Sequence, residues 1–253
     1  IVGGGYIGLE VAAVAAKKGL DVTLAEAEDR ILKRVASAET ADYFRDLHAR
    51  HGVKILEGAR LAGLEGAGKV AGAVMADGAV YPTDFVVVAI GVGPATGLAE
   101  AAGIAVENGI RTDEAGRTSA PNVWAAGDCA SFPYRGQRIR LESVPNAADQ
   151  AEVVAENILG AGKAYQAKPW FWSDQFDVKL QIAGLSQGYD SVVARRDAKS
   201  TSFWYYRGDE LLAVDAMNDP RAYMIAKRLI EAGRSPAKAL AGDPAVPVKS
   251  LLD

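Results

Sequence analysis

The glycine-rich stretch at the front of the chain constrains the fold more than any other feature. The first eight residues read IVGGGYIG, and Gly3, Gly5 and Gly8 satisfy the spacing G-x-G-x-x-G. In that pattern the first glycine permits a tight turn, the second lets the backbone approach a pyrophosphate, and the third lets a helix pack closely on a strand. The N-terminus of the helix that follows would face the phosphates with free backbone N–H groups. Tyr6 and Ile7, between the second and third glycines, are candidate cofactor-binding residues. The stretch predicts a dinucleotide-binding turn between a β-strand and an α-helix.

Glu26 supports this prediction and bears on the choice of nucleotide. It follows the next expected strand, residues 21–25, and lies about 20 residues beyond the glycines, where the fingerprint places an acid on the ribose 2′-OH. A carboxylate accepts from a free hydroxyl but repels a 2′-phosphate. Glu28 and Asp29 come next, and Arg30 only after them. The pattern predicts NADH rather than NADPH. The alternative is a structural turn with Glu26 at a solvated strand end.

Glu10 is a second acidic candidate near the glycines. It lies two residues past the last of them, on the first turn of the expected helix. A carboxylate there interacts favourably with the helix dipole, and it is also well placed to act in a site. Spacing alone leaves both interpretations open.

Hydrophobic patterns predict an α/β fold in three sections, residues 1–93, 94–160 and 161–253. The run FVVVAI at 85–90 is continuously apolar, which is typical of a strand buried on both faces. The other elements expected in the first section are helices over 9–18 and 37–50, strands over 21–25 and 53–56, and an antiparallel meander over 58–82.

The second and third sections show different patterns. A short strand over 123–126 is expected before Gly127 and Asp128, and an apolar stripe predicts a helix over 146–159. Apolar residues alternate from Phe176 to Ile182, as in a half-buried strand. Further strands are expected over 191–194, 202–206 and 211–216, with a tight turn at 207–209 and a helix that begins at Asp219–Pro220.

Composition limits the classes of function. The net charge of −4 argues against a general nucleic-acid binder. The single cysteine, Cys129, excludes an internal disulfide and an all-cysteine metal cluster. No apolar run reaches the length of a membrane span and no signal peptide is evident, so we expect a cytoplasmic protein without a membrane partner. His48 and His51 have no evident partner ligand, so we interpret them as surface residues near a helix end and expect no metal site.

Three stretches together resemble the flavoprotein pyridine-nucleotide reductases: GGGYIGLE, VVVAIGVGP and TSAPNVWAAGDCA. In that superfamily an NAD(P)H domain is inserted into a split FAD domain. The resemblance implies that 1–93 is the NADH-binding domain and that 94–160 is the C-terminal part of the FAD domain. It implies that Gly127 and Asp128 bind FAD, with the aspartate on the ribityl chain. It also makes Ile90 and Gly91 cofactor-binding positions.

Two more stretches, RLESVPNAADQA and PWFWSDQ, resemble the oxygenase-coupled ferredoxin reductases of the putidaredoxin and rubredoxin reductase type. That resemblance implies that the helix after ESVPN points at the flavin pyrimidine end, which makes Ser143, Val144 and Pro145 flavin-proximal. It places Trp172 beside the isoalloxazine and Glu10 near the nicotinamide. It makes 161–253 the C-terminal reductase domain. Gly97 departs from the family pattern, where a polar residue is usual.

The function that the resemblance implies is transfer of electrons from NADH through FAD to a ferredoxin or rubredoxin, which feeds an oxygenase or cytochrome P450. The family has a further G-x-G-x-x-G for FAD at its own N-terminus. This chain has one such motif, at its first residues, so we expect it to correspond to the C-terminal two-thirds or so of a reductase. Acidic electron carriers favour a basic docking patch, and Arg195, Arg196 and Lys199 form the densest basic cluster.

Other functions stay open on the sequence alone. The chain could be a nucleotide-binding fragment without turnover, or part of a monodehydroascorbate reductase-like enzyme. A disulfide reductase needs a catalytic histidine in its C-terminal domain, and no histidine follows residue 51 here. An electron-transfer protein of the apoptosis-inducing type shares the fold, but its C-terminal section does not resemble PWFWSDQFDVKLQIAG.

Overall fold

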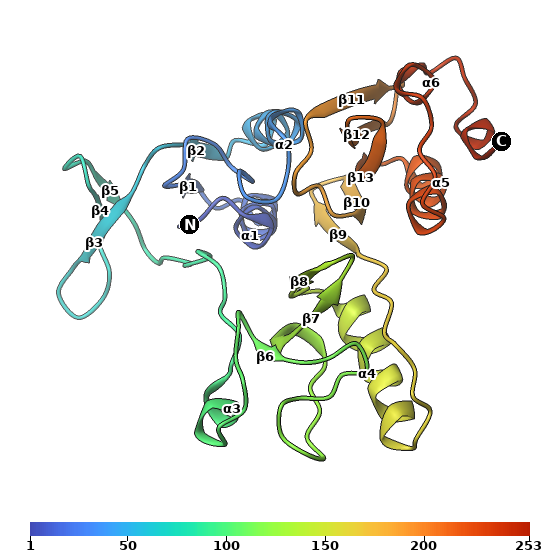
Figure 1. Ribbon diagram of the computed structural model, residues 1–253. Coiled ribbons are helices and arrows are strands. Elements are labelled where there is room, and N and C mark those ends of the chain that lie inside the picture. The colour runs from blue at the N-terminus through green and yellow to red at the C-terminus, as the bar shows by residue number, and fades with distance from the viewer. The chain divides into compact units, whose positions relative to one another are not determined.

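The computed structural model describes residues 1–253, which divide into two compact units (Figure 1). Unit 1 combines residues 1–91 with 172–253, and unit 2 comprises residues 92–171. The expected sections 1–93 and 161–253 therefore fall largely in the same compact unit. Their division into separate domains stays a prediction.

The front half of unit 1 is the predicted α/β arrangement. Strands β1 and β2 pair in parallel, with Thr23 opposite Lys54, and a three-stranded antiparallel meander in the order β3-β4-β5 follows them. Ser37 caps the second helix by accepting a hydrogen bond from the Thr40 N–H. The bounds are α1 (Tyr6–Lys17), β1 (Thr23–Ala25), α2 (Ala38–Arg50), β2 (Lys54–Leu56), β3 (Leu61–Glu65), β4 (Gly72–Met75) and β5 (Val80–Pro82).

The predicted strand over 85–90 is wrong in extent and burial. The segment only bridges Val2, whose N–H donates to the Val87 carbonyl and whose carbonyl accepts from the Ala89 N–H. Phe85 and Ile90 are 60% and 65% exposed. The pairing that the structure shows is limited to this one bridge, which is parallel.

The second half of unit 1 is a five-stranded antiparallel sheet in the order β11-β12-β13-β10-β9, with helices beside it (Figure 1). Asp219 caps the long helix and Pro220 occupies its first turn, as predicted. Phe176 was expected inside a strand, but it lies in the turn between β9 and β10 with φ 57°. The bounds are β9 (Trp170–Gln175), β10 (Val178–Gly184), β11 (Ser191–Arg196), β12 (Thr201–Arg207), β13 (Glu210–Met217), α5 (Pro220–Glu231), α6 (Lys238–Gly242) and η2 (Val248–Leu252).

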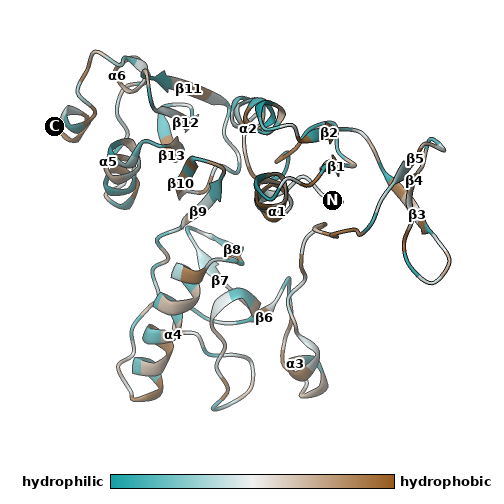
Figure 2. Ribbon diagram, turned by 180° about the vertical axis from the view of Figure 1, so that it is seen from behind, coloured by the Kyte–Doolittle hydropathy of each residue, from teal (hydrophilic) through white to brown (hydrophobic).

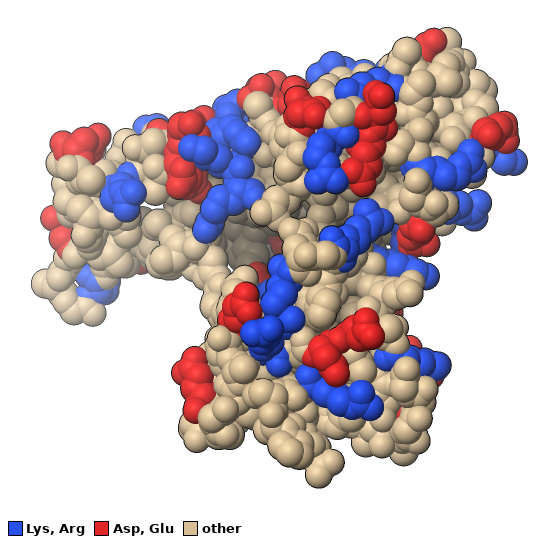
Figure 3. Space-filling view, viewed as in Figure 1, with Lys and Arg blue, Asp and Glu red and all other residues tan.

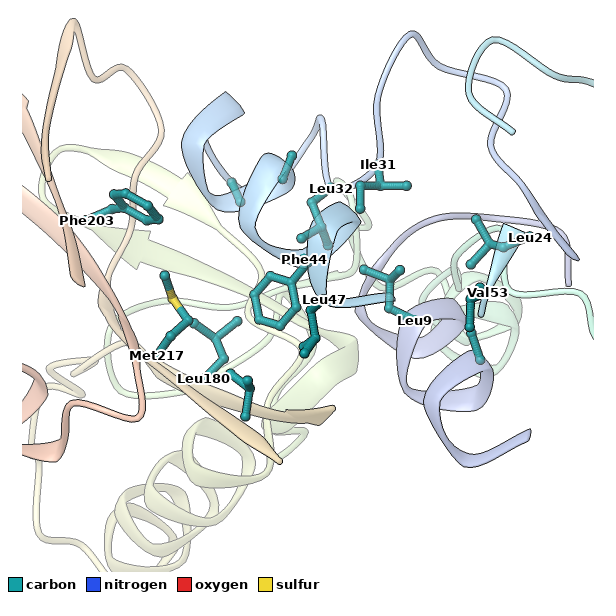
Figure 4. Close-up of a cluster of buried hydrophobic side chains, with 14 of the residues drawn as sticks. Leu9, Leu24, Ile31, Leu32, Phe44, Leu47, Val53, Leu180, Phe203 and Met217 are labelled. Atoms are coloured by element: carbon teal, nitrogen blue, oxygen red, sulfur yellow. The ribbon is translucent and has the colours of Figure 1, made fainter. Parts of the chain in front are cut away.

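The two halves of unit 1 share one hydrophobic core (Figure 4). Phe44 and Leu47 of α2 point toward Leu180 and Met217 of the sheet, and all four are at most 2% exposed. Burying a side chain of this size stabilises the fold by about 1.5–3 kcal/mol. The glycine turn and the C-terminal sheet therefore belong to the same packed unit.

Unit 2 is smaller and built from short elements. The strand expected over 123–126 is absent; Trp124 makes only an isolated bridge to Arg117, because Thr118 and Val123 close a tight turn between them. Apolar stretches of α3 and α4 are visible in Figure 2, and their Leu98 and Val144 are 91% and 71% exposed. The bounds are α3 (Gly97–Ala101), β6 (Ile110–Arg111), η1 (Gly127–Cys129), β7 (Ala130–Tyr134), β8 (Gln137–Ile139) and α4 (Val144–Ile158). None of the helices in either unit has the length and hydropathy needed to cross a bilayer.

Candidate nucleotide-binding site

The glycine turn is shaped by the chain's own backbone. Gly3 has φ +105°, and a Cβ there would come 2.3 Å from the Ala89 carbonyl oxygen. A Cβ on Gly8 would come 1.9 Å from the Gly3 carbonyl oxygen. A Cβ on Gly5 would meet nothing within 4 Å. The first and third glycines are required by packing, whereas the second borders open space that a ligand backbone can approach.

Helix α1 begins at this open position. Gly5 is its N-cap and no side chain caps it. The first bond along the helix runs from the Leu9 N–H to the Gly5 carbonyl (3.0 Å), so the Ile7 and Gly8 N–H groups lie in the turn that precedes the regular ladder. Such a helix start favours an anion, as a dinucleotide pyrophosphate requires.

The side chain of Tyr6 faces the core of unit 1, so only the backbone of Tyr6 is available to a ligand at the turn. Burial raises the pKa of its hydroxyl well above the usual range, and Asp215 and Tyr205 add to that shift. The side chain of Ile7 is 57% exposed. The sequence correctly marked both residues as part of the turn but did not predict that their side chains diverge.

Glu26 lies against the glycine turn, and its predicted contact with a ribose hydroxyl stays a prediction. Its carboxylate accepts from the Gly4 N–H (2.6 Å) and from the Glu28 N–H (2.8 Å). A carboxylate has about four acceptor positions, so capacity for a ribose hydroxyl remains. These bonds fix the end of β1 to the glycines and set the carboxylate in place before a ligand arrives.

Two cations that follow Glu26 in the sequence, Arg30 and Lys33, are bonded to other groups of the same loop. Lys33 pairs with Glu28 (3.2 Å) and Asp29 (3.1 Å). The Arg30 guanidinium donates to backbone carbonyls of residues 31–37, including that of Ala36 (2.9 Å). Both side chains are therefore engaged within the loop after β1.

Arg34 is a residue that the sequence analysis missed. A Cβ added to Gly91 would lie 3.9 Å from one of its guanidinium nitrogens, which places this cation beside a predicted cofactor-binding position. Its only signal in the sequence was its place in the charged loop after Glu26. Ile90, the neighbouring predicted residue, is 65% exposed.

Glu10 is held by a residue far away in the sequence. Its Oε1 accepts from the Ser173 hydroxyl (2.6 Å), and Ser173 directly follows Trp172 on β9. Glu10 therefore lies beside the strand that carries the predicted flavin aromatic. Trp172 itself is partly buried, on the opposite face of the strand from Ser173.

His48 corrects the prediction of two surface histidines. Its side chain is fully buried, and Nε2 lies 2.9 Å from Gln175 Oε1. Burial lowers the pKa of His48. His51 stacks on Phe176 with ring centroids 3.8 Å apart. No group of three or more His, Cys, Asp or Glu side chains converges on a possible metal position.

The second predicted site lies in unit 2. Gly127 has φ +77°, and its N–H donates to Gln150 Oε1 (2.8 Å). The Asp128 side chain is exposed and makes no hydrogen bond. Ser143 caps α4 by accepting from the Asn146 N–H (3.3 Å). An unengaged carboxylate after a left-handed glycine fits the predicted contact with a flavin hydroxyl chain.

The helix start at Ser143 was predicted to face the flavin. Val144 is 71% exposed and Pro145 lies in the first turn, so the helix begins at the surface of unit 2. Trp172, Ile90 and Gly91 belong to unit 1, whereas Gly127, Asp128 and Ser143 belong to unit 2. The roles of all these residues toward a flavin stay predictions.

The turn, the acid after β1 and the parallel strand pair define a dinucleotide-binding α/β protein. The family model described as pyridine nucleotide-disulphide oxidoreductase matches residues 1–151, and the one described as reductase C-terminal matches residues 170–252. The chain belongs to the pyridine nucleotide-disulphide oxidoreductase family and carries the reductase C-terminal region. This confirms the α/β fold class and the resemblance to pyridine-nucleotide reductases.

The chain is similar to several ferredoxin reductases. The chain is 42% identical to the ferredoxin reductase subunit of 5,5'-dehydrodivanillate O-demethylase from Sphingobium sp., over 99% of this chain and 63% of that protein. It is 39% identical to putidaredoxin reductase from Pseudomonas putida, over 100% of this chain and 61% of that protein. A crystal structure of the covalent putidaredoxin reductase–putidaredoxin complex matches with a TM-score of 0.95 at 40% identity, over 99% of this chain and 62% of that one. The chain thus spans under two-thirds of the length of these relatives.

Proposed function

We propose that this chain is the NADH-binding and C-terminal part of an FAD-dependent reductase that passes electrons from NADH to a ferredoxin or rubredoxin. The observation that carries the proposal is the glycine turn tied to Glu26, in a chain whose relatives are named ferredoxin reductases. The electron carrier in turn serves an oxygenase or a cytochrome P450. We propose a cytoplasmic location for the protein.

The residues of unit 1 bind and orient the nucleotide. The start of α1 and the open space at Gly5 hold the pyrophosphate, and Glu26 accepts from the adenosine ribose. A flavin, when bound, would supply the link between two-electron hydride transfer and the one-electron chemistry that an iron–sulfur carrier requires. The chain needs no acid or base for hydride transfer, so its contribution is orientation and charge near the reacting rings.

Two nucleotides compete for this site, and the geometry favours NADH. Glu26 is preset by two backbone N–H groups, and a 2′-phosphate would meet its charge. Arg30 and Lys33, the cations next in sequence, are held by loop carbonyls and by Glu28 and Asp29.

In unit 2, Asp128 and the start of α4 would hold the flavin. The Asp128 carboxylate would accept from the ribityl hydroxyls, and the helix start at Ser143 would favour negative charge at the pyrimidine end. Both are accessible in the structure, as Asp128 and Val144 are exposed.

The structure revises the docking patch suggested by the sequence. Arg195 donates to the carbonyls of Asp243 (2.7 Å) and Val246 (2.6 Å), so it ties down the C-terminal tail. Arg196 lies over the ring of Phe203, 5.5 Å from its centroid. Lys and Arg are interspersed with Asp and Glu on the face shown in Figure 3. Arg195 therefore holds the C-terminal tail of the chain and is not proposed to bind the electron carrier.

The test is anaerobic mixing of the full-length protein with NADH, followed by a ferredoxin. We expect NADH to bleach the flavin absorbance and the reduced protein then to reduce the ferredoxin. A protein that binds NADH without flavin or turnover would support the alternative of a nucleotide-binding module. Reduction of a disulfide substrate instead of ferredoxin would also contradict the proposal.

A further inference from the structure

A line of buried polar side chains runs from Glu10 into the core of unit 1. Ser173 donates to Glu10 Oε1 (2.6 Å), Gln175 Nε2 donates to Ser173 Oγ (3.0 Å), and Gln175 Oε1 lies 2.9 Å from His48 Nε2. Ser173, Gln175 and His48 are all 0% exposed. The line joins α1, β9 and α2, and nothing in hydride transfer as described above uses its inner members.

The hydrogen atoms along this line have one consistent direction. Glu10 is a carboxylate and can only accept, so the Ser173 hydroxyl donates to it. Ser173 then accepts from the Gln175 amide nitrogen, which leaves the Gln175 amide oxygen to accept from His48. His48 must therefore carry its proton on Nε2. Its Nδ1 is buried without a hydrogen-bond partner, which fits a neutral ring whose pKa is lowered by burial.

The outer end of the line is open. Glu10 is partly exposed, and its Oε2 makes no hydrogen bond. One carboxylate oxygen is thus fixed by a buried donor, while the other can accept from a ligand N–H or O–H. Two aromatic contacts secure the inner end, since the His48 and His51 rings both pack on Phe176 at centroid distances of 5.0 and 3.8 Å.

We propose that Ser173 and Gln175, anchored on neutral His48, are positioning residues that hold the Glu10 carboxylate so that its Oε2 accepts from the nicotinamide half of the nucleotide. This inference rests on the proposed NADH site. It differs from the roles of the glycine turn and Glu26, which contact the adenosine half and the pyrophosphate. It also gives the buried Ser173 and Gln175 side chains of β9 a role in the site, because each bonds the next member of the line.

The test compares binding of NAD⁺ with binding of ADP-ribose, which lacks the nicotinamide ring, by calorimetry on the full-length protein. In Ser173→Ala we expect NAD⁺ affinity and the rate of flavin reduction at saturating NADH each to fall about tenfold, the size expected when a hydrogen bond to a charged group is lost. ADP-ribose affinity should stay unchanged. Ser202→Ala is the matched control, because Ser202 is equally buried in the same sheet and bonds Trp204 and Asp219 instead.

A double-mutant cycle separates positioning from a general structural effect. If Ser173 acts through Glu10, adding Ser173→Ala to Glu10→Ala should change NAD⁺ affinity no further. Ser173→Cys keeps a side chain of similar size with a weak donor and should give a smaller loss in the same direction, which covers the case in which the alanine variant does not fold. Equal losses for NAD⁺ and ADP-ribose, or additive losses in the cycle, would overturn the inference. If the wild-type protein bound neither ligand, the proposed function would fall as well.

Discussion

The two glycine turns of the chain differ in what holds them. At the front, Gly3 and Gly8 are dictated by backbone atoms within 2.3 Å of where a Cβ would stand, and Glu26 is bound by two N–H groups. At Gly127 the nearest atom to such a Cβ is the Ala147 Cβ, 3.3 Å away, and Asp128 is bonded only through its backbone carbonyl, which accepts from Arg140. In the front turn the acid, Glu26, is bonded by the chain's own backbone. In the second turn the side chain of Asp128 stays available to a ligand.

The buried polar side chains of the two units that carry these turns also differ. Unit 1 buries ionisable groups, among them His48 and Asp215, inside a core that joins both of its halves. The buried polar side chains of unit 2 are neutral, and Gln150 and Asn157 are bonded to backbone groups. We therefore expect substitutions and changes of pH to alter the free energy of unfolding strongly in unit 1 and weakly at the Gly127 turn.

The largest effect is expected for Gly8→Ala. The new Cβ would lie 1.9 Å from the Gly3 carbonyl, so the turn must move, at a cost of about 3 kcal/mol or more in the free energy of unfolding. NADH binding should be lost together with stability. Urea unfolding and calorimetric titration measure the two quantities.

Gly5→Ala is the matched control for that substitution. Its Cβ meets nothing within 4 Å, so the free energy of unfolding should change by under about 1 kcal/mol. NADH affinity should still fall, because the methyl group occupies the approach to the pyrophosphate. A Gly5→Ala protein with normal NADH affinity would show that the ligand does not approach at this point.

An intermediate effect is expected from Asp215, which accepts hydrogen bonds from Tyr205 and from Thr40 (2.7 Å). Burial raises the pKa of Asp215 from 3.8 to about 6, although both hydrogen bonds act in the opposite direction. Between about pH 4 and pH 6 the folded protein therefore binds more protons than the unfolded chain. The contribution of Asp215 to the free energy of unfolding should therefore fall as the pH rises through that window. The expected decrease is on the order of 2 kcal/mol, with no further change above the window.

Asp215→Asn should remove this pH dependence, because an amide oxygen can accept both hydroxyl bonds without a charge. Urea unfolding at several pH values between 4 and 7 provides the measurement. Asp209→Asn, at an exposed turn, is the control and should keep the wild-type profile. An unchanged slope in Asp215→Asn would mean that this carboxyl is not the source of it.

The smallest effect on stability is expected for Asp128→Asn. The side chain is exposed and bonds nothing in the chain, so the free energy of unfolding should stay within about 0.5 kcal/mol of wild type. Under the proposed function the flavin content of the full-length protein should nevertheless fall, as measured by absorbance against protein concentration. A clear loss of stability with full flavin content would reverse the contrast between the two turns.

Local signals in the sequence predicted local structure well. The cap at Asp219, the helix after Ser37 and the antiparallel meander all depend on residues close in sequence. Burial was predicted less well. The apolar run at 85–90 forms only one bridge, to Val2, and stays largely exposed. His48 is buried by Gln175 and Phe176, which lie more than a hundred residues away.

The contact between Glu10 and Ser173 shows why part of the site could not be predicted. The two residues are 163 positions apart, and neither has a spacing that points to the other. The contact exists because the C-terminal sheet packs onto α1 and α2 through a shared core. The resemblance suggested a role for Glu10 but not the residues that hold it.

The central claim is that the front turn and Glu26 form an NADH site serving a flavin. Stopped-flow mixing of the full-length protein with NADH and with NADPH, without oxygen, tests it most directly. We predict that NADH reduces the flavin faster and at lower concentration, because the Glu26 carboxylate, held by two backbone N–H groups, would repel a 2′-phosphate. Equal or faster reduction by NADPH, or no reduction by either nucleotide, would contradict the claim.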